Sequence, residues 1–517
     1  MNTPWPTLLL NPLFVVFILI FSITSHASDS EYAQWLKQTQ GEFQNYLDEN
    51  DKAFISFLNQ TWEEVDVEDA KIRDPKPKPV NIPVAQPIII EKPQITVIPP
   101  IIVPAIEKPD VEIPTTETPT IAVPVIKPPV MKAPIIETPV IIDRPVVKKD
   151  HNSRTISYDF FGESISVNYN KNFKQSFRSK ISNKSIADFW TELATQPHKE
   201  IIEQLSQRAE SLKLNDWGTA LLFDQFSREL QGSNQYNQSS RQLTSWFLLV
   251  KAGFNARIAY NDQIFLLMPS KQELFATTFF TFNGQRFYSV ALNEKSMKPG
   301  KVYTYNGESL DGQKDLDFSQ PNNFLTSKNQ TERTLSFAYN NEQHDIKVHY
   351  PRDMVNYFNT FPQLDIKNYF EAGMPSQTAY ELLSQLKPII QGHTETEAVN
   401  RLLRFVQTAF TYETDDEQFK QENYLFPLET LHYPASDCED RAAIFAWLTK
   451  SLLNLDVVIL DFPGHIAAAV AFNQTAPGDN WKLNGRQYTV TDPTYINANV
   501  GMTMPMFKNI TPKLITF

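Results

Sequence analysis

Proline recurs every few residues from Asp74 to Val147, and this feature limits most strongly how the chain can fold. Each proline removes a backbone N–H donor and disfavours helical geometry at the residue before it. No helix or central strand can run through such a stretch, so extended, polyproline-II-like chain is expected. At ~3.1 Å per residue, about 70 residues could span up to ~200 Å. Residues 74–150 are therefore predicted to be a linker, and their Ile and Val content could equally make them adhesive.

The N-terminus carries an apolar run from Leu13 to Phe21, followed by the small-x-small ending Ser25-His26-Ala27. This pattern is typical of a secretory signal peptide, and the run is short for a membrane span. Residues 1–27 are therefore predicted to export the chain as a secreted or periplasmic protein. Because no Lys or Arg precedes the run, an uncleaved anchor that attaches the protein to the membrane is the alternative.

Between the signal and the linker, residues 28–73 are predicted to be a helical segment. Aromatic and leucine side chains recur at helical spacing from Glu31 to Val65. This stretch is similar to the N-terminal segment of some bacterial murein lytic transglycosylases. The resemblance implies a cell-envelope setting.

Charge and cysteine content exclude some classes of function. The chain has 517 residues, with 47 Lys and Arg against 59 Asp and Glu, which gives a formal net charge of −12. Nucleic acids are bound through clustered basic residues, and no such cluster is present, so no nucleic-acid partner is expected. Cys438 is the single cysteine, so an internal disulfide is impossible. A lone cysteine is either a small buried hydrophobe or a reactive thiol.

The rest of the chain is predicted to be α+β, because strand-like and helix-like patterns alternate in it. Residues 151–315 are expected to form an α+β domain, residues 316–394 a β-rich and then helical connection, and residues 395–517 a C-terminal domain. The expected strand regions are 155–170, 257–268, 277–291 and 334–350, and the expected helices are 186–213, 219–230, 242–252, 378–391 and 395–409.

The chemistry is predicted to lie around Cys438. Ser436 and Glu439 fit an N-cap and capping box, S-x-x-E, at the start of an apolar helix. Cys438 would then lie in the first turn, where free N–H groups and the helix macrodipole favour a thiolate and could bind an oxyanion. The carboxylates of Asp437, Glu439 and Asp440 oppose this effect, so the thiol must depend on a nearby imidazole.

His465 and Asp492, which come later in the sequence, are candidates to activate this thiol. After a predicted strand, Leu455–Asp461, the turn Pro463-Gly464 leads into a second strand that begins at His465. A histidine there is held in one place, as an acid/base group must be. A third strand reaches Asp492, whose carboxylate could accept from the other ring nitrogen and fix the tautomer.

The motifs DCEDRA, PGH and DPTY, in this order and spacing, resemble the transglutaminase-like superfamily, whose core has a papain-like α+β fold. The resemblance covers roughly residues 395–505. It implies a helix-borne cysteine packed on an antiparallel sheet. It also implies that Cys438 is the nucleophile, His465 the general base and acid, and Asp492 the residue that orients the imidazole.

The resemblance also implies an oxyanion hole. In this fold a side chain upstream of the cysteine often completes the oxyanion hole, and Tyr433 and Gln421 are the candidates here.

Taken singly, the cysteine could be a core residue, the histidine could cap a turn, and the aspartate could start an Asp-Pro turn. Together they favour catalysis, because three coincidences would otherwise be needed.

The middle of the chain has a pattern that resembles the C-terminal one. When Lys251 is set against Lys450, a helix followed by strands overlays in both regions. Ser239 then falls opposite the cysteine, and Leu266 falls opposite the histidine. This predicts an inactive transglutaminase-like repeat, with an unrelated α+β domain as the alternative.

No metal or cofactor is predicted. The acidic stretch 413–417 lacks the D-x-D-x-D-G spacing of a calcium loop. The expected function is acyl transfer at amide bonds, most simply hydrolysis of a peptide or peptidoglycan-type substrate. Protein cross-linking by transfer to an amine is one alternative. A non-catalytic binding or scaffold protein of the cell envelope is another.

Overall fold

The computed structural model describes residues 49–72, 82–86, 151–232, 234–293, 298–305, 312–319 and 329–517, and the predicted signal peptide lies outside these ranges. The chain divides after Phe57 into two compact units. In the first unit, residues 49–57 are helical. Within the described ranges, no helix is both long enough and apolar enough to cross a membrane.

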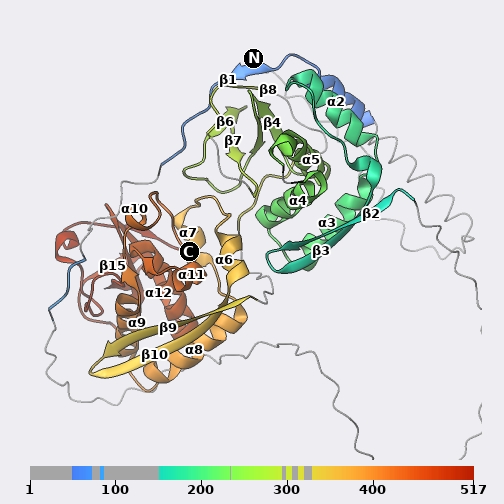
Figure 1. Ribbon diagram of the computed structural model, residues 1–517. Coiled ribbons are helices and arrows are strands. Elements are labelled where there is room, and N and C mark those ends of the chain that lie inside the picture. The colour runs from blue at the N-terminus through green and yellow to red at the C-terminus, as the bar shows by residue number, and fades with distance from the viewer. Residues whose placement is uncertain are drawn as a thin grey trace, which may run out of the picture. The chain divides into compact units, whose positions relative to one another are not determined.

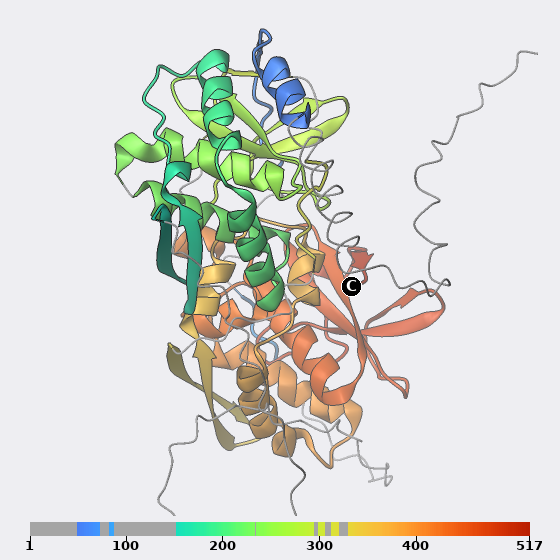
Figure 2. The ribbon, with the colours of Figure 1, turned by 90° about the vertical axis from the view of Figure 1, so that its right-hand side faces the viewer.

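The middle region contains a six-stranded sheet whose neighbouring strands are all antiparallel, in the order β1-β8-β4-β5-β7-β6 (Figures 1 and 2). Its strands are β1 (Glu63–Val65), β4 (Arg257–Tyr260), β5 (Ile264–Met268), β6 (Phe279–Phe282), β7 (Gln285–Val290) and β8 (Val302–Thr304). A separate hairpin joins β2 (Ser153–Phe160) and β3 (Glu163–Asn170). The helices are α2 (Asn183–Ala194), α3 (Lys199–Ser211), α4 (Asp216–Gln231) and α5 (Gln238–Lys251).

The helix expected over 186–213 is in fact two helices. A capping box at Ser182 starts α2, and α3 begins after His198. Pro197 lies between the two helices, where its ring and missing N–H prevent a continuous helix. The helical periodicity of the side chains therefore continues through residues at which Pro197 interrupts the backbone helix.

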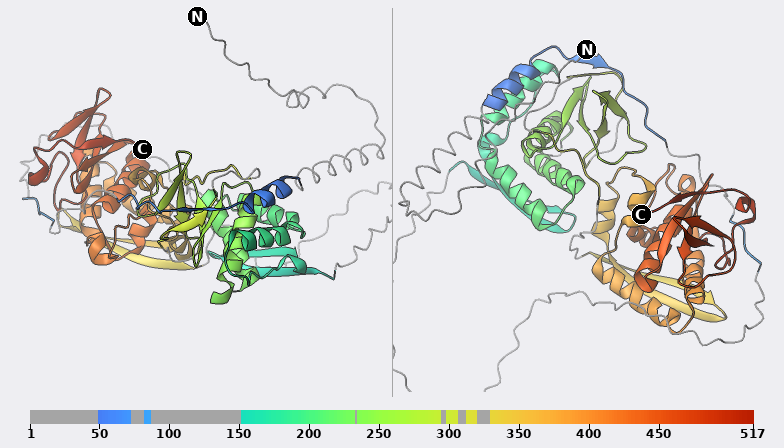
Figure 3. Two further views of the ribbon diagram at one scale, coloured as in Figure 1. Left: turned by 90° about the horizontal axis from the view of Figure 1, so that it is seen from above. Right: turned by 180° about the vertical axis from the view of Figure 1, so that it is seen from behind.

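The connecting region forms a long hairpin and a set of helices. The hairpin joins β9 (Gln330–Tyr339) and β10 (Glu342–Pro351), and it is followed by α6 (Arg352–Phe358), α7 (Ile366–Glu371) and α8 (Ser376–Ile390). β10 packs against α8 and β9 packs against the next helix, α9 (Glu395–Ala409), an arrangement that Figures 1 and 3 show. The alternating buried and exposed residues of β9 and β10 give the hairpin one face toward these helices.

The C-terminal region packs helix α12 (Cys438–Leu453) against a five-stranded antiparallel sheet. The strand order is β15-β16-β14-β13-β17. The strands are β13 (Asp456–Phe462), β14 (His465–Ala471), β15 (Asn480–Leu483), β16 (Arg486–Thr491) and β17 (Lys513–Ile515). The shorter elements are β11 (Thr411–Tyr412), α10 (Asp415–Gln418), α11 (Pro427–His432) and β12 (Ala435–Ser436). Every residue of β14 is buried, so the strand has covered faces on both sides. The predicted α+β class with antiparallel sheets is confirmed.

One expectation for the N-terminal part is wrong. Glu63–Val65, expected at the end of a helix, form strand β1 and pair with β8. Part of the proline-rich stretch also lies on the folded body: Val84 forms a bridge with Ile496, and the Ala85 N–H donates to the Ile496 carbonyl at 2.7 Å. Ala85 is buried in the apolar cluster of the C-terminal sheet, because its small side chain fits there.

The two sheets share an arrangement. In each, a helix is followed by a hairpin whose two strands lie inside the sheet. In the middle region these are α5 with β4 and β5, and in the C-terminal region they are α12 with β13 and β14. A second hairpin then adds on one side, β6–β7 or β15–β16, and a last strand adds on the other, β8 or β17. Asn283-Gly284 and Asn484-Gly485 turn these second hairpins, and all four residues have positive φ. Asn-Gly is the sequence that such two-residue turns favour.

Candidate active site

Cys438 is the first residue of α12, in the first helical turn as expected. The N-cap is Asp437, whose N–H donates to the Asp440 carboxylate at 3.3 Å. The predicted capping box of Ser436 and Glu439 is therefore wrong by one residue. Ser436 lies in β12, and its hydroxyl accepts from Arg441 Nε at 3.4 Å.

The thiol of Cys438 is buried and has two partners. It donates to Glu439 Oε2 at 2.9 Å, and it accepts from the Ile466 N–H at 3.4 Å. Burial, followed by the charges of Glu439 and Asp437, raises the pKa of Cys438 well above its usual value. The helix N-terminus is thus outweighed, and the thiol is neutral at rest rather than a preformed thiolate.

His465 is the first residue of β14, and the turn Pro463-Gly464 places it opposite Phe462. Its Nε2 lies 2.9 Å from Asp492 Oδ2, and both side chains are buried. Its Nδ1 has no hydrogen-bond partner in the described part of the chain. The ring of Phe507 stacks on the imidazole at 5.0 Å with an angle of 15° between the planes. The imidazole is therefore fixed with one nitrogen on a carboxylate and the other available.

Asp492 follows directly after β16 and is held from several sides. Its Oδ1 accepts the backbone N–H groups of Thr494 at 2.9 Å and Tyr495 at 3.1 Å. Gln407 on α9 donates to the Asp492 carbonyl at 3.0 Å and to the Ala498 carbonyl at 3.0 Å. Gln407 is a positioning residue that the sequence analysis missed, because a single glutamine on an amphipathic helix carries no motif.

A cavity of about 450 Å³ has both Cys438 and His465 in its wall. Asp492 does not line it, as is expected of a residue that orients the imidazole from behind. The other lining residues come from seven segments and are Lys71, Ile72, Glu273, Phe275, Asp365, Ile366, Glu422, Tyr424, Glu439, Asp461, Phe462, Gly464, Ile466, Lys513 and Ile515. The middle region thus contributes to the wall of the cavity that contains the cysteine.

The two oxyanion candidates do not line this cavity. The Tyr433 hydroxyl donates to Asn359 at 2.7 Å, and Gln421 is exposed. The described structure gives neither residue a contact with Cys438. The backbone N–H groups at the start of α12 are nearer to the thiol and are the donors that the local geometry offers.

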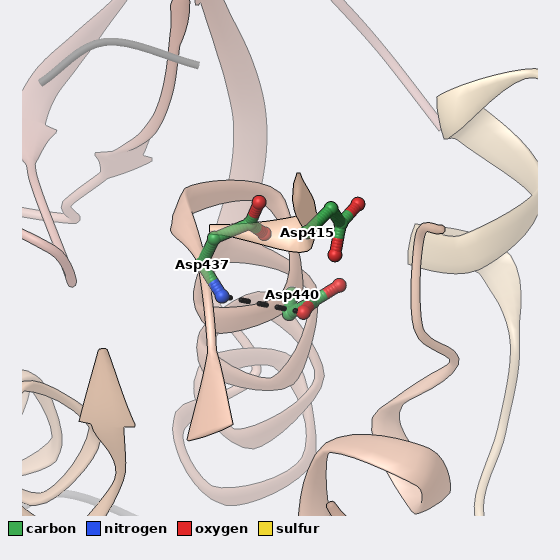
Figure 4. A group of neighbouring side chains, drawn as sticks. All are labelled: Asp415, Asp437 and Asp440. Atoms are coloured by element: carbon green, nitrogen blue, oxygen red, sulfur yellow. Dashed lines mark hydrogen bonds between the residues drawn. The ribbon is translucent and has the colours of Figure 1, made fainter. Parts of the chain in front are cut away.

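Buried charge is concentrated around the cysteine. Asp415, Asp437 and Asp440 lie next to one another (Figure 4). Burial and the neighbouring carboxylates raise the pKa of Asp415 to about 10, and they raise the pKa values of Asp437 and Asp440 well above the usual range. Among the described residues, this group and a second one, Asp415, Glu422 and Glu439, place their carboxylate oxygens closely enough to hold a metal ion.

Arg441 is the buried cation beside these acids. Its guanidinium donates to the Phe410 carbonyl at 2.7 Å and to the Gln407 carbonyl at 3.4 Å. Burial lowers the pKa of Arg441 to about 10. The arginine therefore holds two carbonyl groups at the end of α9 in place, and none of its hydrogen bonds to the described residues goes to these carboxylates.

The structure thus brings Cys438, His465 and Asp492 together from the start of a helix, the start of a strand and the end of another strand. The thiol reaches the backbone of the residue after His465, and the imidazole reaches Asp492. No family model, no curated protein and no solved structure matches the chain.

Proposed function

We propose that the protein is a transglutaminase-like cysteine enzyme that acts on amide bonds by acyl transfer, with Cys438, His465 and Asp492 as its triad. One observation carries the proposal: the His465 imidazole is fixed on Asp492 through Nε2, while its buried Nδ1 has no partner among the described residues and the cysteine shares its cavity. A nucleophile, a base and a residue that orients the base are the parts that such chemistry requires.

In the proposed reaction, Sγ of Cys438 attacks the carbonyl carbon of an amide while its proton passes to Nδ1 of His465. Because the thiol is neutral at rest, this proton moves during the attack. The tetrahedral intermediate expels the amine, which takes the proton from the imidazolium, and a thioester remains. Water then gives a proton to His465 and attacks the thioester, which releases the acid and restores the thiol. Asp492 stabilises the imidazolium throughout.

Hydrolysis of a peptide or peptidoglycan-type amide is the proposed outcome. The compartment is part of the same proposal: an exported protein, secreted or periplasmic, meets such substrates at the cell envelope. An amine in place of water would give a cross-linked product, and the triad serves both reactions equally. The product distinguishes them, because hydrolysis creates new termini whereas cross-linking of a glutamine side chain releases ammonia.

The test uses an activated ester, p-nitrophenyl acetate, and intact-protein mass spectrometry. The proposal expects a burst of p-nitrophenol equal to the amount of enzyme, and one acetyl group on Cys438. His465→Ala is expected to abolish the burst, and Cys438→Ala is expected to remove the acetylated species. A peptide and a muropeptide mixture then identify the amide substrate.

A non-catalytic scaffold is the second candidate, and one observation favours it: the Cys438 side chain is 1% exposed and its thiol is held by Glu439. The scaffold would give no burst and no acetyl group on the native protein. Labelling only after denaturation would therefore refute the enzyme and support the scaffold.

We further propose that the middle region, 151–315, is an inactive copy of the C-terminal fold. The shared strand order and the two Asn-Gly turns support this. When the starts of the elements are matched, Gln238 and Ile264 correspond to Cys438 and His465, one and two residues before the Ser239 and Leu266 that the sequence alignment places there. Neither Gln238 nor Ile264 can act as nucleophile or base. The copy would instead supply cavity wall, as Glu273 and Phe275 do.

A further inference from the structure

A second large cavity lies in the middle region and shares no lining residue with the cavity of Cys438. Its volume is about 640 Å³, which is within the range of small-molecule sites. Its wall comes from two segments: residues 176–181, which precede α2, and residues 234–239, which lead into α5. The cavity is therefore large enough for a ligand of one or two sugar rings.

The wall of this cavity is polar. Most small-molecule sites are lined mainly by apolar side chains, whereas this one has three serines and two asparagines, Ser176, Ser179, Ser239, Asn234 and Asn237. Hydroxyl and amide groups at this density favour a ligand that itself carries many hydroxyl groups, because each polar group of the ligand then finds a partner.

The two asparagines offer complementary groups. Asn234 Oδ1 accepts the Tyr236 N–H at 3.0 Å, and Asn237 Nδ2 donates to the Gln231 carbonyl at 2.7 Å. Among the described residues, the Asn234 amide nitrogen and the Asn237 amide oxygen have no partner. One is a donor and the other an acceptor, which suits sugar hydroxyl groups, since each of these both donates and accepts.

The cavity is also cationic. Arg178 and Lys180 line it, and no acid does. Within the described ranges neither side chain forms an ion pair, although the whole chain has a formal net charge of −12. A guanidinium binds carboxylate and phosphate groups through two parallel hydrogen bonds. The ligand that fits such a wall therefore carries an anionic group.

Tyr236 adds an aromatic ring to this wall. It belongs to the short helix η3 (Gln235–Asn237), and the residue is 81% exposed. A tyrosine ring presents a rigid apolar face at little cost in conformational entropy. One face of a pyranose ring is formed by C–H groups while its rim carries hydroxyls. An aromatic ring among amides and hydroxyls matches both parts of a sugar.

We propose that this cavity binds a saccharide that carries an anionic group. The sugar ring would stack on Tyr236, its hydroxyls would bind the asparagines and serines, and the anionic group would bind Arg178 and Lys180. Ser239, which the sequence alignment places opposite Cys438, lines the cavity. The proposed inactive copy would then have a binding site of its own beside that position. This site does not depend on the proposed catalysis.

The experiment titrates the full-length protein with sugars and follows saturation-transfer difference NMR. N-acetylmuramic acid carries a carboxylate, N-acetylglucosamine 6-phosphate carries a phosphate, and N-acetylglucosamine is the neutral control. At least one anionic sugar is expected to bind about fivefold more tightly than the neutral one. Whether the carboxylate or the phosphate sugar binds better identifies the anionic group. The affinity of the anionic sugar should also fall as sodium chloride rises from about 0.05 to about 0.5 M.

Variants separate the two parts of the site. Tyr236→Ala should weaken the binding of every sugar by at least about fivefold. Combining Arg178→Gln with Lys180→Gln should make the anionic sugars bind like the neutral one. Tyr303→Ala and Lys184→Gln are the matched controls, because both residues are exposed and lie outside the cavity wall. All the substituted side chains are exposed, so each variant should melt like the wild type.

Several outcomes would overturn the proposal. These are no transfer to any sugar, equal binding of anionic and neutral sugars by the wild type, and binding of acetate or inorganic phosphate as tight as that of the anionic sugars. Equal weakening by Tyr236→Ala and Tyr303→Ala would also overturn it. The salt dependence is measured on the wild type and needs no variant to fold. None of these outcomes involves Cys438, so the proposed triad is tested separately.

Discussion

The carboxylate of Asp492 lies 2.9 Å from Nε2 of His465, and this contact determines which imidazole nitrogen is available. An ionised Asp492 accepts a proton-bearing Nε2, so Nδ1 carries a lone pair and can take the proton of the thiol. Asp492, which does not line the cavity, thus determines that Nδ1 is the nitrogen that would accept the proton of Cys438.

Asp492→Asn should therefore lower the rate of acylation by about 10³–10⁴-fold, with the fold unchanged. The asparagine amide can donate to Nε2, and Nδ1 would then carry the proton and could not act as a base. The p-nitrophenol burst rate measures this effect. Asp479→Asn, at another carboxyl group of the C-terminal region, is the control, and equal loss in both variants would contradict the assigned role.

Glu439→Gln should make Cys438 more reactive toward iodoacetamide. The negative charge of Glu439 contributes to the raised pKa of Cys438, and a glutamine keeps an acceptor for the thiol without the charge. A thiol with a raised pKa is protonated at neutral pH and reacts faster only as the pH rises. The rate of alkylation, measured from pH 7 to 10, should reach a given value at a lower pH in the variant than in the wild type. Each unit by which the pKa falls should raise the rate about tenfold at a pH below the pKa. Identical native profiles would contradict this, and the two denatured proteins should react at the same rate.

Glu429→Gln should change how stability depends on pH. Burial raises the pKa of Glu429 from 4.5 to about 8, so the folded protein keeps a proton that the unfolded chain releases between these values. The free energy of unfolding of the wild type should then fall across that window, by about 1.4 kcal/mol per pH unit from this group, and not further above it. The glutamine keeps an oxygen for the Phe426 N–H and has no proton to release. Urea unfolding at pH 5 and pH 8 should show a smaller decrease in the variant, and parallel decreases would refute the assignment.

Arg441→Met should destabilise the protein by at least about 2 kcal/mol, because two buried carbonyl groups lose their donor. The change leaves the carbonyls of Phe410 and Gln407 without their donor and removes the buried cation beside Asp437 and Asp440. Urea unfolding measures the loss. Arg486→Met is the control, because Arg486 and Asp456 form an exposed pair, whose removal should cost less than about 1 kcal/mol. A similar decrease in the free energy of unfolding in both variants would contradict the prediction that Arg441 stabilises the protein more than the exposed Arg486 does.

Most elements of the C-terminal region could be predicted from the sequence because each has a local signal. The helix over Glu395–Ala409 has the bounds that its apolar periodicity indicates, and the Pro463-Gly464 turn fixes where β14 begins. Strand β1 could not be predicted, because Glu63–Val65 continue a helical pattern and become a strand only by pairing with β8. Such pairing depends on residues far away in the chain.

The grouping of Cys438, His465 and Asp492 could be predicted because helix, turn and strand ends each placed one residue. The N-cap could not be resolved, since both Ser436 and Asp437 have an acid three residues later and only the backbone distinguishes them. The neutral state of the thiol also escaped the sequence analysis. It depends on burial and on the direction of the Glu439 side chain, which sequence does not encode locally.

The contact of Ala85 with Ile496 changes the role that the proline-rich stretch can play. The proline-rich stretch follows β1 of the six-stranded sheet, and its Ala85 contacts the C-terminal sheet. The chain then continues to β2, which belongs to the same compact unit. A segment tied at both ends is a closed loop, and its length adds an entropy of closure that grows only with the logarithm of the number of residues. A single proteolytic cut between residues 87 and 150 would therefore leave two fragments that remain joined through the pairing of β1 with β8 and the contact of Ala85 with Ile496.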